Sequence, residues 1–211
     1  MTMTQEVPLI RLVDDDELFR MSQTMLLKMR GWEVAAYESA EEFLQHADLQ
    51  RPGCILLDVR MGGMTGMQAH RELVERGCRL PVIFLTGHGD ISMAVRAMQR
   101  GAVNFLEKPV KPFDLLELVQ KAVTASVQDA HKQEEQARNQ ALFDALAMRE
   151  KEIVQLAALD TPNKIIARQL GIAEPTVKMH RANAFAKLGV KSPLEAYRAL
   201  ERLGVLDGRQ E

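Results

Sequence analysis

Short apolar runs alternate with helical patterns over the first 125 residues of the chain. The third and fourth runs are almost continuously apolar, which is typical of central parallel strands that helices cover on both faces. Between the runs, Asp16 is placed to cap a helix, and Ser39 with Glu42 forms a capping box. This alternation predicts an α/β fold, a doubly wound five-stranded parallel sheet. The five expected strands are Leu9–Val13, Glu33–Tyr37 and residues 54–57, 82–85 and 103–106.

Two further helical features complete the expected first domain. Met21, Met25 and Met29 recur at i, i+4 spacing, which predicts that they face the core. Another helix is expected to begin at Asp90 and to end at Gly101, because each residue suits that end of a helix.

After Phe113 the pattern is helical throughout. Residues 126–141 contain no Gly or Pro and no large apolar residue after Val127, which favours an exposed helical linker. Shorter helical stretches follow at about 147–158, 162–170, 174–188 and 193–203. We therefore expect a domain over residues 1–125, a linker over 126–141 and a small all-α domain over 142–211.

Composition places the chain among soluble globular proteins, since 46% of its 211 residues are apolar and 27% are charged. The net charge of −2 is unevenly distributed. Residues 1–125 carry 14 basic and 17 acidic side chains, a net of −3, whereas residues 142–211 carry 11 and 9, a net of +2. The two cysteines lack the spacing of a metal site, and no signal peptide or membrane span is apparent, so we expect a cytoplasmic protein.

Polar side chains follow four of the expected strands. Asp14 and Asp15 follow the first strand, Asp58 the third, Thr86 the fourth and Lys108 the fifth. Because ligands bind beyond the carboxyl ends of parallel strands, we expect these side chains to meet at one edge of the sheet. Clustered carboxylates suit Mg²⁺, and an ammonium with a hydroxyl suits phosphoryl oxygens. A single Asp after a strand is often only a turn or cap residue, and for Asp16 this is the preferred interpretation.

The strings VDDDE, LLDVRM, LTGHGD and FLEKPV resemble the receiver domain of two-component response regulators. The resemblance implies that Asp58 accepts a phosphoryl group from a sensor histidine kinase. It also implies a Mg²⁺ ion held by Asp14, Asp15, Asp58 and the backbone carbonyl of Arg60. Thr86 and Lys108 would contact the phosphoryl group, and Phe105 would be the aromatic switch residue that moves inward with Thr86.

One departure from the family and one histidine concern the loops around this site. The family usually has Met-Pro-Gly-Met where this chain has Met61-Gly62-Gly63-Met64, and the missing Pro predicts a looser loop. His88 follows Thr86 by two residues, and either a general base or an ordinary exposed histidine fits that position.

The second motif is a short helix, a turn and a basic helix. Six basic residues and one acidic residue lie between Thr161 and Lys191. This layout can place a recognition helix in the major groove of DNA, although the charge alone favours a solvated helix face. Pattern favours DNA binding, because MREKEIVQLAAL, NKIIARQLGI, TVKMHR and AKLGV resemble the LuxR-type helix-turn-helix module.

By this resemblance, Lys178, Met179 and Ala182 face the bases, and Arg181 lies beside them. Basic or polar residues placed to reach phosphates are Lys164, Thr176 and Lys187, while His180 is either a phosphate contact or simply exposed. The usual Ser cap of the recognition helix is replaced by Ala173, for which Glu174 is a possible substitute.

Together the motifs indicate a response regulator of the FixJ/NarL type, closest to the FixJ branch. Phosphorylation would promote homodimerisation through the fourth helix, fifth strand and fifth helix, and so control binding to double-stranded promoter DNA, with RNA polymerase as a further partner. Such a protein is not an enzyme beyond its own phosphoryl transfer and dephosphorylation. The alternatives are a magnesium-dependent phosphatase with an aspartyl nucleophile, which usually has an acid where Arg60 stands, and a regulator whose receiver needs no phosphate.

Overall fold

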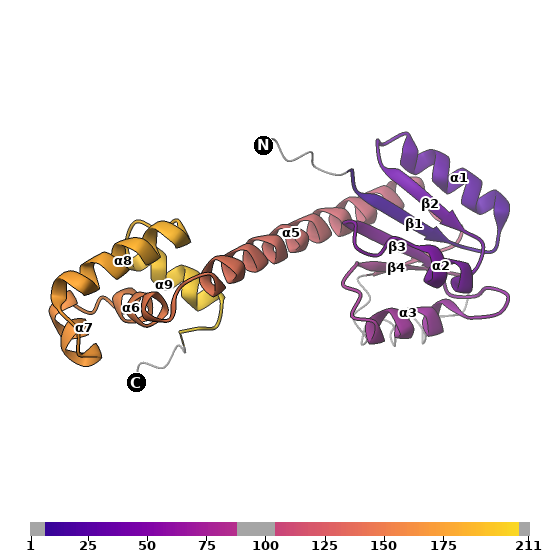
Figure 1. Ribbon diagram of the computed structural model, residues 1–211. Coiled ribbons are helices and arrows are strands. Elements are labelled where there is room, and N and C mark those ends of the chain that lie inside the picture. Colours follow the sequence, from indigo (N-terminus) through magenta and orange to yellow (C-terminus); the bar gives the residue numbers. More distant parts are fainter. Residues whose placement is uncertain (1–6, 88–103, 207–211) are drawn as a thin grey trace. The chain divides into compact units, whose positions relative to one another are not determined.

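The computed structural model of the chain describes residues 7–87 and 104–206. The chain divides into two compact units, Met1–Ala130 and His131–Glu211, which we describe one at a time (Figure 1).

The first unit is built on a parallel five-stranded sheet. Its strands are β1 (Leu9–Val13), β2 (Glu33–Tyr37), β3 (Gly53–Asp58), β4 (Val82–Thr86) and β5 (Asn104–Glu107). The order across the sheet is β2-β1-β3-β4-β5, and every neighbouring pair is parallel. The predicted fold class is therefore confirmed. The strands β1, β3 and β4 are buried along their whole length, which the apolar runs predicted for β3 and β4.

Helices flank this sheet. They are α1 (Glu17–Lys28), α2 (Ala40–His46), α3 (Gly66–Glu75) and the first part of α5 (Pro112–Asp144). Two predicted caps are confirmed: Asp16 accepts a hydrogen bond from the Phe19 N–H at 3.1 Å, and Ser39 accepts one from the Glu42 N–H at 3.2 Å. The helix expected between Asp90 and Gly101 lies outside the described residues.

The core of this unit lies on both faces of the sheet. On one face, Phe43 of α2 and Leu73 of α3 pack with strand residues such as Phe84. On the other face, Leu27 of α1 and Val119 of α5 pack in a separate cluster. The sheet is thus covered on both sides, which leaves its carboxyl edge as the place where polar side chains can gather.

The predicted burial of the methionine stripe is wrong. Met21, Met25 and Met29 are 63%, 67% and 76% exposed. Leu27 and partly buried Phe19 belong to the core cluster instead. Helix α1 has two apolar stripes of the same helical period, and periodicity alone does not say which one contacts the sheet.

The second unit is all-helical. After the end of α5 come α6 (Met148–Ala158), α7 (Asn163–Leu170), α8 (Glu174–Leu188) and α9 (Pro193–Arg202), which confirms the four predicted stretches. Ile153, Ile166 and Val177 are fully buried between α6, α7 and α8. Phe143 and Leu146, at and just after the end of α5, pack against α6 and α9.

The turn between α7 and α8 is short and sharply formed. Gly171 has a left-handed conformation with φ 65°, which ends α7 without strain. Ala173 stands at the N-cap of α8 with no side-chain hydrogen bond, and the Glu174 carboxylate lies 3.5 Å from the ammonium of Lys178. Across residues 7–87 and 104–206, the helices include none long and apolar enough to cross a membrane.

Candidate functional site

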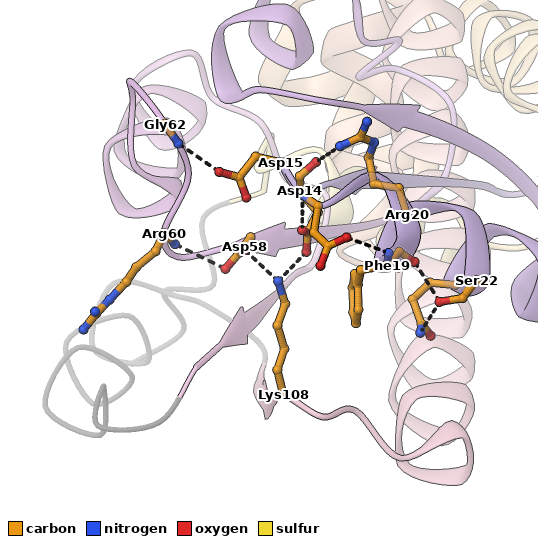
Figure 2. Close-up of polar contacts among 11 residues, drawn as sticks. Asp14, Asp15, Phe19, Arg20, Ser22, Asp58, Arg60, Gly62 and Lys108 are labelled. Atoms are coloured by element: carbon orange, nitrogen blue, oxygen red, sulfur yellow. Dashed lines mark hydrogen bonds and ion pairs between the residues drawn. The ribbon is translucent and has the colours of Figure 1, made fainter.

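Polar side chains meet at the carboxyl edge of the sheet (Figure 2). Asp14 follows β1, Asp58 is the last residue of β3, and Lys108 follows β5. The ammonium of Lys108 lies 2.6 Å from Asp14 Oδ2 and 2.7 Å from Asp58 Oδ2. Parallel pairing of β1 with β3 places the two carboxylates side by side, as the strand ends predicted.

Asp14 and Asp58 are buried, whereas their neighbour Asp15 is exposed to solvent. Asp14 is fully buried and Asp58 is 6% exposed, while Asp15 is an exposed residue. Burial raises the pKa of Asp14, and hydrogen bonds from Lys108 and from the Asp16 N–H only partly offset this rise. For Lys108, burial acts to lower the pKa, but its bonds to Asp14 and Asp58 outweigh burial and raise it. The site therefore keeps Lys108 charged and makes a further cation beside Asp14 favourable.

Three carboxylates are arranged as a metal could use them. Oxygens of Asp14, Asp15 and Asp58 all lie within 4.8 Å of one another. Hard divalent cations such as Mg²⁺ prefer oxygen ligands of this kind. Three carboxylates this close together leave negative charge that the one ammonium of Lys108 does not balance, so the donor set fits a divalent cation.

The other sequence-predicted residues of this edge lie nearby, with contacts of their own. Arg60 donates its backbone N–H to Asp58 Oδ1 at 3.2 Å. Thr86 is buried, and its hydroxyl donates to the carbonyl of Gly87 at 3.1 Å. Phe105 of β5 is 40% exposed, so its ring points outward. His88 lies outside the described residues.

Two residues of α1 that the sequence did not predict for the site contact it. The Phe19 ring of α1 lies 4.5 Å from the ammonium of Lys108, a cation–π contact. Arg20 donates to the carbonyl of Asp14 at 2.6 Å, as Figure 2 shows. Phe19 and Lys108 come from different elements, so no local pattern in the sequence pointed to this contact.

The loop after β3 is held by two carboxylates from other elements. The Gly62 N–H donates to Asp15 Oδ2 at 3.1 Å. The Met64 N–H donates to Glu41 Oε1 of α2 at 2.8 Å. The sequence predicted a looser loop because Pro is missing, but it gave no sign of these two bonds.

In the second unit, α8 presents an exposed set of candidate DNA contacts. Lys178, Met179 and Ala182 are exposed, as is Lys164 on α7, while Thr176 and His180 are partly exposed. Met179 is 52% exposed. The exposed stripe of α8 therefore contains the residues expected to face bases.

Two basic side chains of α8 have partners inside the unit. Arg181 donates to Asn163 Oδ1 at 2.9 Å and lies over the Phe185 ring at 5.2 Å. Lys187 lies 2.6 Å from Oε2 of buried Glu150 on α6. These contacts give Arg181 and Lys187 a structural role in addition to the DNA contact that the sequence predicts.

Comparisons with known proteins agree with this division. The family model described as "Response regulator receiver domain" matches residues 10–120. The model described as "Bacterial regulatory proteins, luxR family" matches residues 144–200.

Relatives align with nearly the whole chain. Nodulation protein W of Bradyrhizobium diazoefficiens is 40% identical, over 93% of this chain and 87% of its own length. Transcriptional regulatory protein FixJ of Rhizobium meliloti is 39% identical, over 87% of this chain and 90% of its own. Among solved structures, the response regulator StyR aligns with a TM-score of 0.87 at 38% identity, over 93% of this chain and 99% of its own.

Proposed function

The chain belongs to the transcriptional response regulators that join a receiver domain to a LuxR-type DNA-binding domain, and we propose that phosphorylation of Asp58 by a sensor histidine kinase controls its binding to promoter DNA. The observation that carries this proposal is the contact of Asp58 with Lys108, beside Asp14 and Asp15, in a chain that also contains a helix-turn-helix. Neither the relatives nor the described residues support a phosphatase.

We assign residues 1–125 to the receiver domain, 126–141 to a helical linker and 142–211 to the DNA-binding domain. The family matches at 10–120 and 144–200 support these bounds, as does α5, which is helical and exposed across residues 131–138. Because the target is promoter DNA, the protein would act in the cytoplasm.

Asp58 is the nucleophile in this proposal. One of its carboxylate oxygens forms a bond to phosphorus while the bond from phosphorus to the kinase histidine nitrogen breaks, and the imidazole leaves with that electron pair. Lys108 already contacts Asp58 and then bonds a phosphoryl oxygen, while the Thr86 hydroxyl donates to another. Thr86 must leave its bond to Gly87 to do so, and Phe105 moves inward as it turns.

Asp14, Asp15 and Asp58 would hold Mg²⁺ together with the carbonyl of Arg60. When bound, the ion offsets the negative charge of the carboxylates and of the phosphoryl oxygens. Phosphorylation acts as a population shift, because the phosphoryl group contacts Lys108 and Thr86 only in the active arrangement.

At the DNA, Lys178, Met179 and Ala182 face the bases and Arg181 lies beside them, with Ala182 limited to apolar contact. Lys164, Thr176, His180 and Lys187 serve the phosphates. A homodimer would bind two half-sites and present the DNA-bound complex to RNA polymerase. In this scheme the protein catalyses only its own phosphoryl transfer and dephosphorylation.

Acetyl phosphate with MgCl₂ tests the nucleophile directly. A phosphate-affinity gel should show a retarded band for the full-length protein and none for Asp58→Asn. Asp114→Asn, an equivalent change at the exposed start of α5, should behave as the unaltered protein. A retarded band in Asp58→Asn would overturn the assignment.

A duplex selected from a random library by the phosphorylated protein tests the DNA face. Lys164→Ala should weaken binding and reduce the slope of log affinity against log salt by about 1, since one phosphate contact is lost. Lys132→Ala, an exposed lysine on α5, is the control and should leave the slope unchanged. An unchanged slope in Lys164→Ala would count against this face.

A further inference from the structure

The loop between β3 and α3 gives its backbone donors to side chains of other elements. Its Gly62 N–H is bound to Asp15, which follows β1, and its Met64 N–H is bound to Glu41 of α2. Gly63 lies between them with φ 89°, and a Cβ there would lie 2.8 Å from Glu41 Oε1. The glycine at 63 is therefore needed for the backbone conformation and for the approach of Glu41.

The glycine at 62 has no such steric reason. Its φ is not in the left-handed region, and a Cβ built on it meets nothing within 4 Å. Proline, which the family usually has at this position, lacks an N–H. In this chain Gly62 donates a hydrogen bond to Asp15, and a proline at this position could not donate it.

That bond holds a solvent-exposed carboxylate in one position. Asp15 is exposed, and an exposed aspartate samples several rotamers. In Figure 2 one oxygen of Asp15 faces Gly62 and the other is turned toward Asp58. A carboxylate usually gives Mg²⁺ a single oxygen, so the bond to Gly62 leaves the second oxygen available on the side of Asp14 and Asp58.

We propose that the Gly62 N–H is a positioning donor for Asp15, which orients this carboxylate for Mg²⁺ binding. The inference rests on the proposed function, because that function assigns Asp15 to the metal. Hydrogen bonds from neighbouring groups orient metal ligands in general, and their loss weakens the metal's binding.

Two substitutions at one position compare the loss of glycine with the loss of the N–H, since alanine keeps this donor and proline removes it. Calorimetric titration of the full chain with MgCl₂ should give Gly62→Ala the dissociation constant of the unaltered protein. Gly62→Pro removes the donor and should raise the dissociation constant about 3- to 10-fold, the net worth of one ordinary hydrogen bond. Equal affinities for the Pro and Ala variants would overturn the inference.

Amide hydrogen exchange gives a second readout that needs no proline and no metal. In Asp15→Ala, the Gly62 amide should exchange about 3-fold faster or more, because its acceptor is gone. The Met64 amide, which is bound to Glu41, is the internal reference and should not change. Equal exchange of the Gly62 amide in both proteins would contradict the proposed bond.

The MgCl₂ titrations also distinguish failure of this inference from failure of the proposed function. If the unaltered protein binds no Mg²⁺, both the metal assignment and this inference fail. If the unaltered protein binds Mg²⁺ and Gly62→Pro binds it equally well, only the positioning role of Gly62 fails.

Discussion

The ammonium of Lys108 lies between two buried carboxylates and the face of an aromatic ring. Asp14 and Asp58 each lie within 2.7 Å of it, and the Phe19 ring lies 4.5 Å away. A lysine held by contacts on three sides keeps its charge and its position. One cation does not satisfy both acids, however, since burial still raises the pKa of Asp14. The charge of the buried Asp14 carboxylate is therefore only partly compensated by its neighbours.

We predict that Asp14→Asn stabilises the metal-free protein. The substitution removes a buried charge whose neighbours only partly compensate it, and gains at such functional sites are about 0.5–2 kcal/mol in the free energy of unfolding. Urea denaturation at pH 7 in EDTA measures this change. Asp16→Asn is the matched control, because Asn caps a helix as well as Asp does. A loss of stability in Asp14→Asn would contradict the interpretation.

The sequence pattern locates residues that follow strands, but not the contacts made by loops or by one face of a helix. Asp58 and Lys108 follow strands, and strand ends are readable from apolar runs. The direction of the Gly62 N–H is set by the path of a loop, which no periodicity describes. The position of the Phe19 ring is set by the rotation of α1 about its axis, and only packing against the sheet fixes that rotation.

At the scale of elements, the sequence pattern does not show which face of α1 is buried. Its buried side contains Leu27, and its outer side contains Met21, Met25 and Met29. Both sides have helical spacing and apolar residues, so the sequence is ambiguous about the face. The structure resolves this ambiguity in favour of the side with Leu27 and Phe19.

We expect Met25→Gln to change the free energy of unfolding by no more than about 0.5 kcal/mol, because the side chain is already exposed. Leu27→Ala on the same helix should cost about 2–5 kcal/mol, because it leaves a cavity in the core. Chemical denaturation compares the two variants. A similar cost for both would mean that the methionines are buried after all.

A buried carboxylate adds a polar contact to the apolar packing of α6 against α8. Glu150 accepts from the Ala147 N–H at the start of α6 and from Lys187 near the end of α8. The hydrogen bond from Lys187, followed by that from Ala147, lowers the pKa of Glu150. An acid with a lowered pKa in the folded state stabilises that state above its ordinary pKa.

We predict that Glu150→Gln destabilises the second unit at pH 7. The difference from the unaltered protein should shrink as the pH falls below the ordinary pKa of glutamate and through the lower folded value, because both proteins are then uncharged at this position. Hydrogen exchange of α6 in the full chain measures it. Glu152→Gln, which breaks an exposed pair with Arg149, should change stability by no more than about 0.5 kcal/mol. A difference that does not depend on pH would contradict the role of the charge.

At the scale of the whole molecule, the uneven charge now has a structural basis. Asp14, Asp15 and Asp58 gather at one edge of the acidic first unit. Lys164 and Lys178 are exposed on α7 and α8 of the basic second unit. The net charge of −2 conceals two units with opposite chemistry, one suited to a cation and a phosphoryl group and one suited to DNA.

Phosphorylation should convert the protein from monomer to dimer. The face expected to dimerise includes β5, where Phe105 is 40% exposed, and α5, while its fourth helix lies outside the described residues. Sedimentation velocity with and without acetyl phosphate measures the change, and Asp58→Asn should remain monomeric in both. An identical oligomeric state of the unaltered protein before and after treatment would count against the mechanism.

The sequence by itself determined the order of the strands and helices, the division into two domains, and the acids and lysine at the sheet edge. These features depend on local periodicity and on the rule that parallel strands end together. Tertiary structure alone decided which side of α1 is buried, that Phe19 covers Lys108, that Glu150 binds Lys187, and that Gly62 donates to Asp15. The physical reason is that these contacts join segments whose relative rotation and path come from packing, which local pattern does not encode.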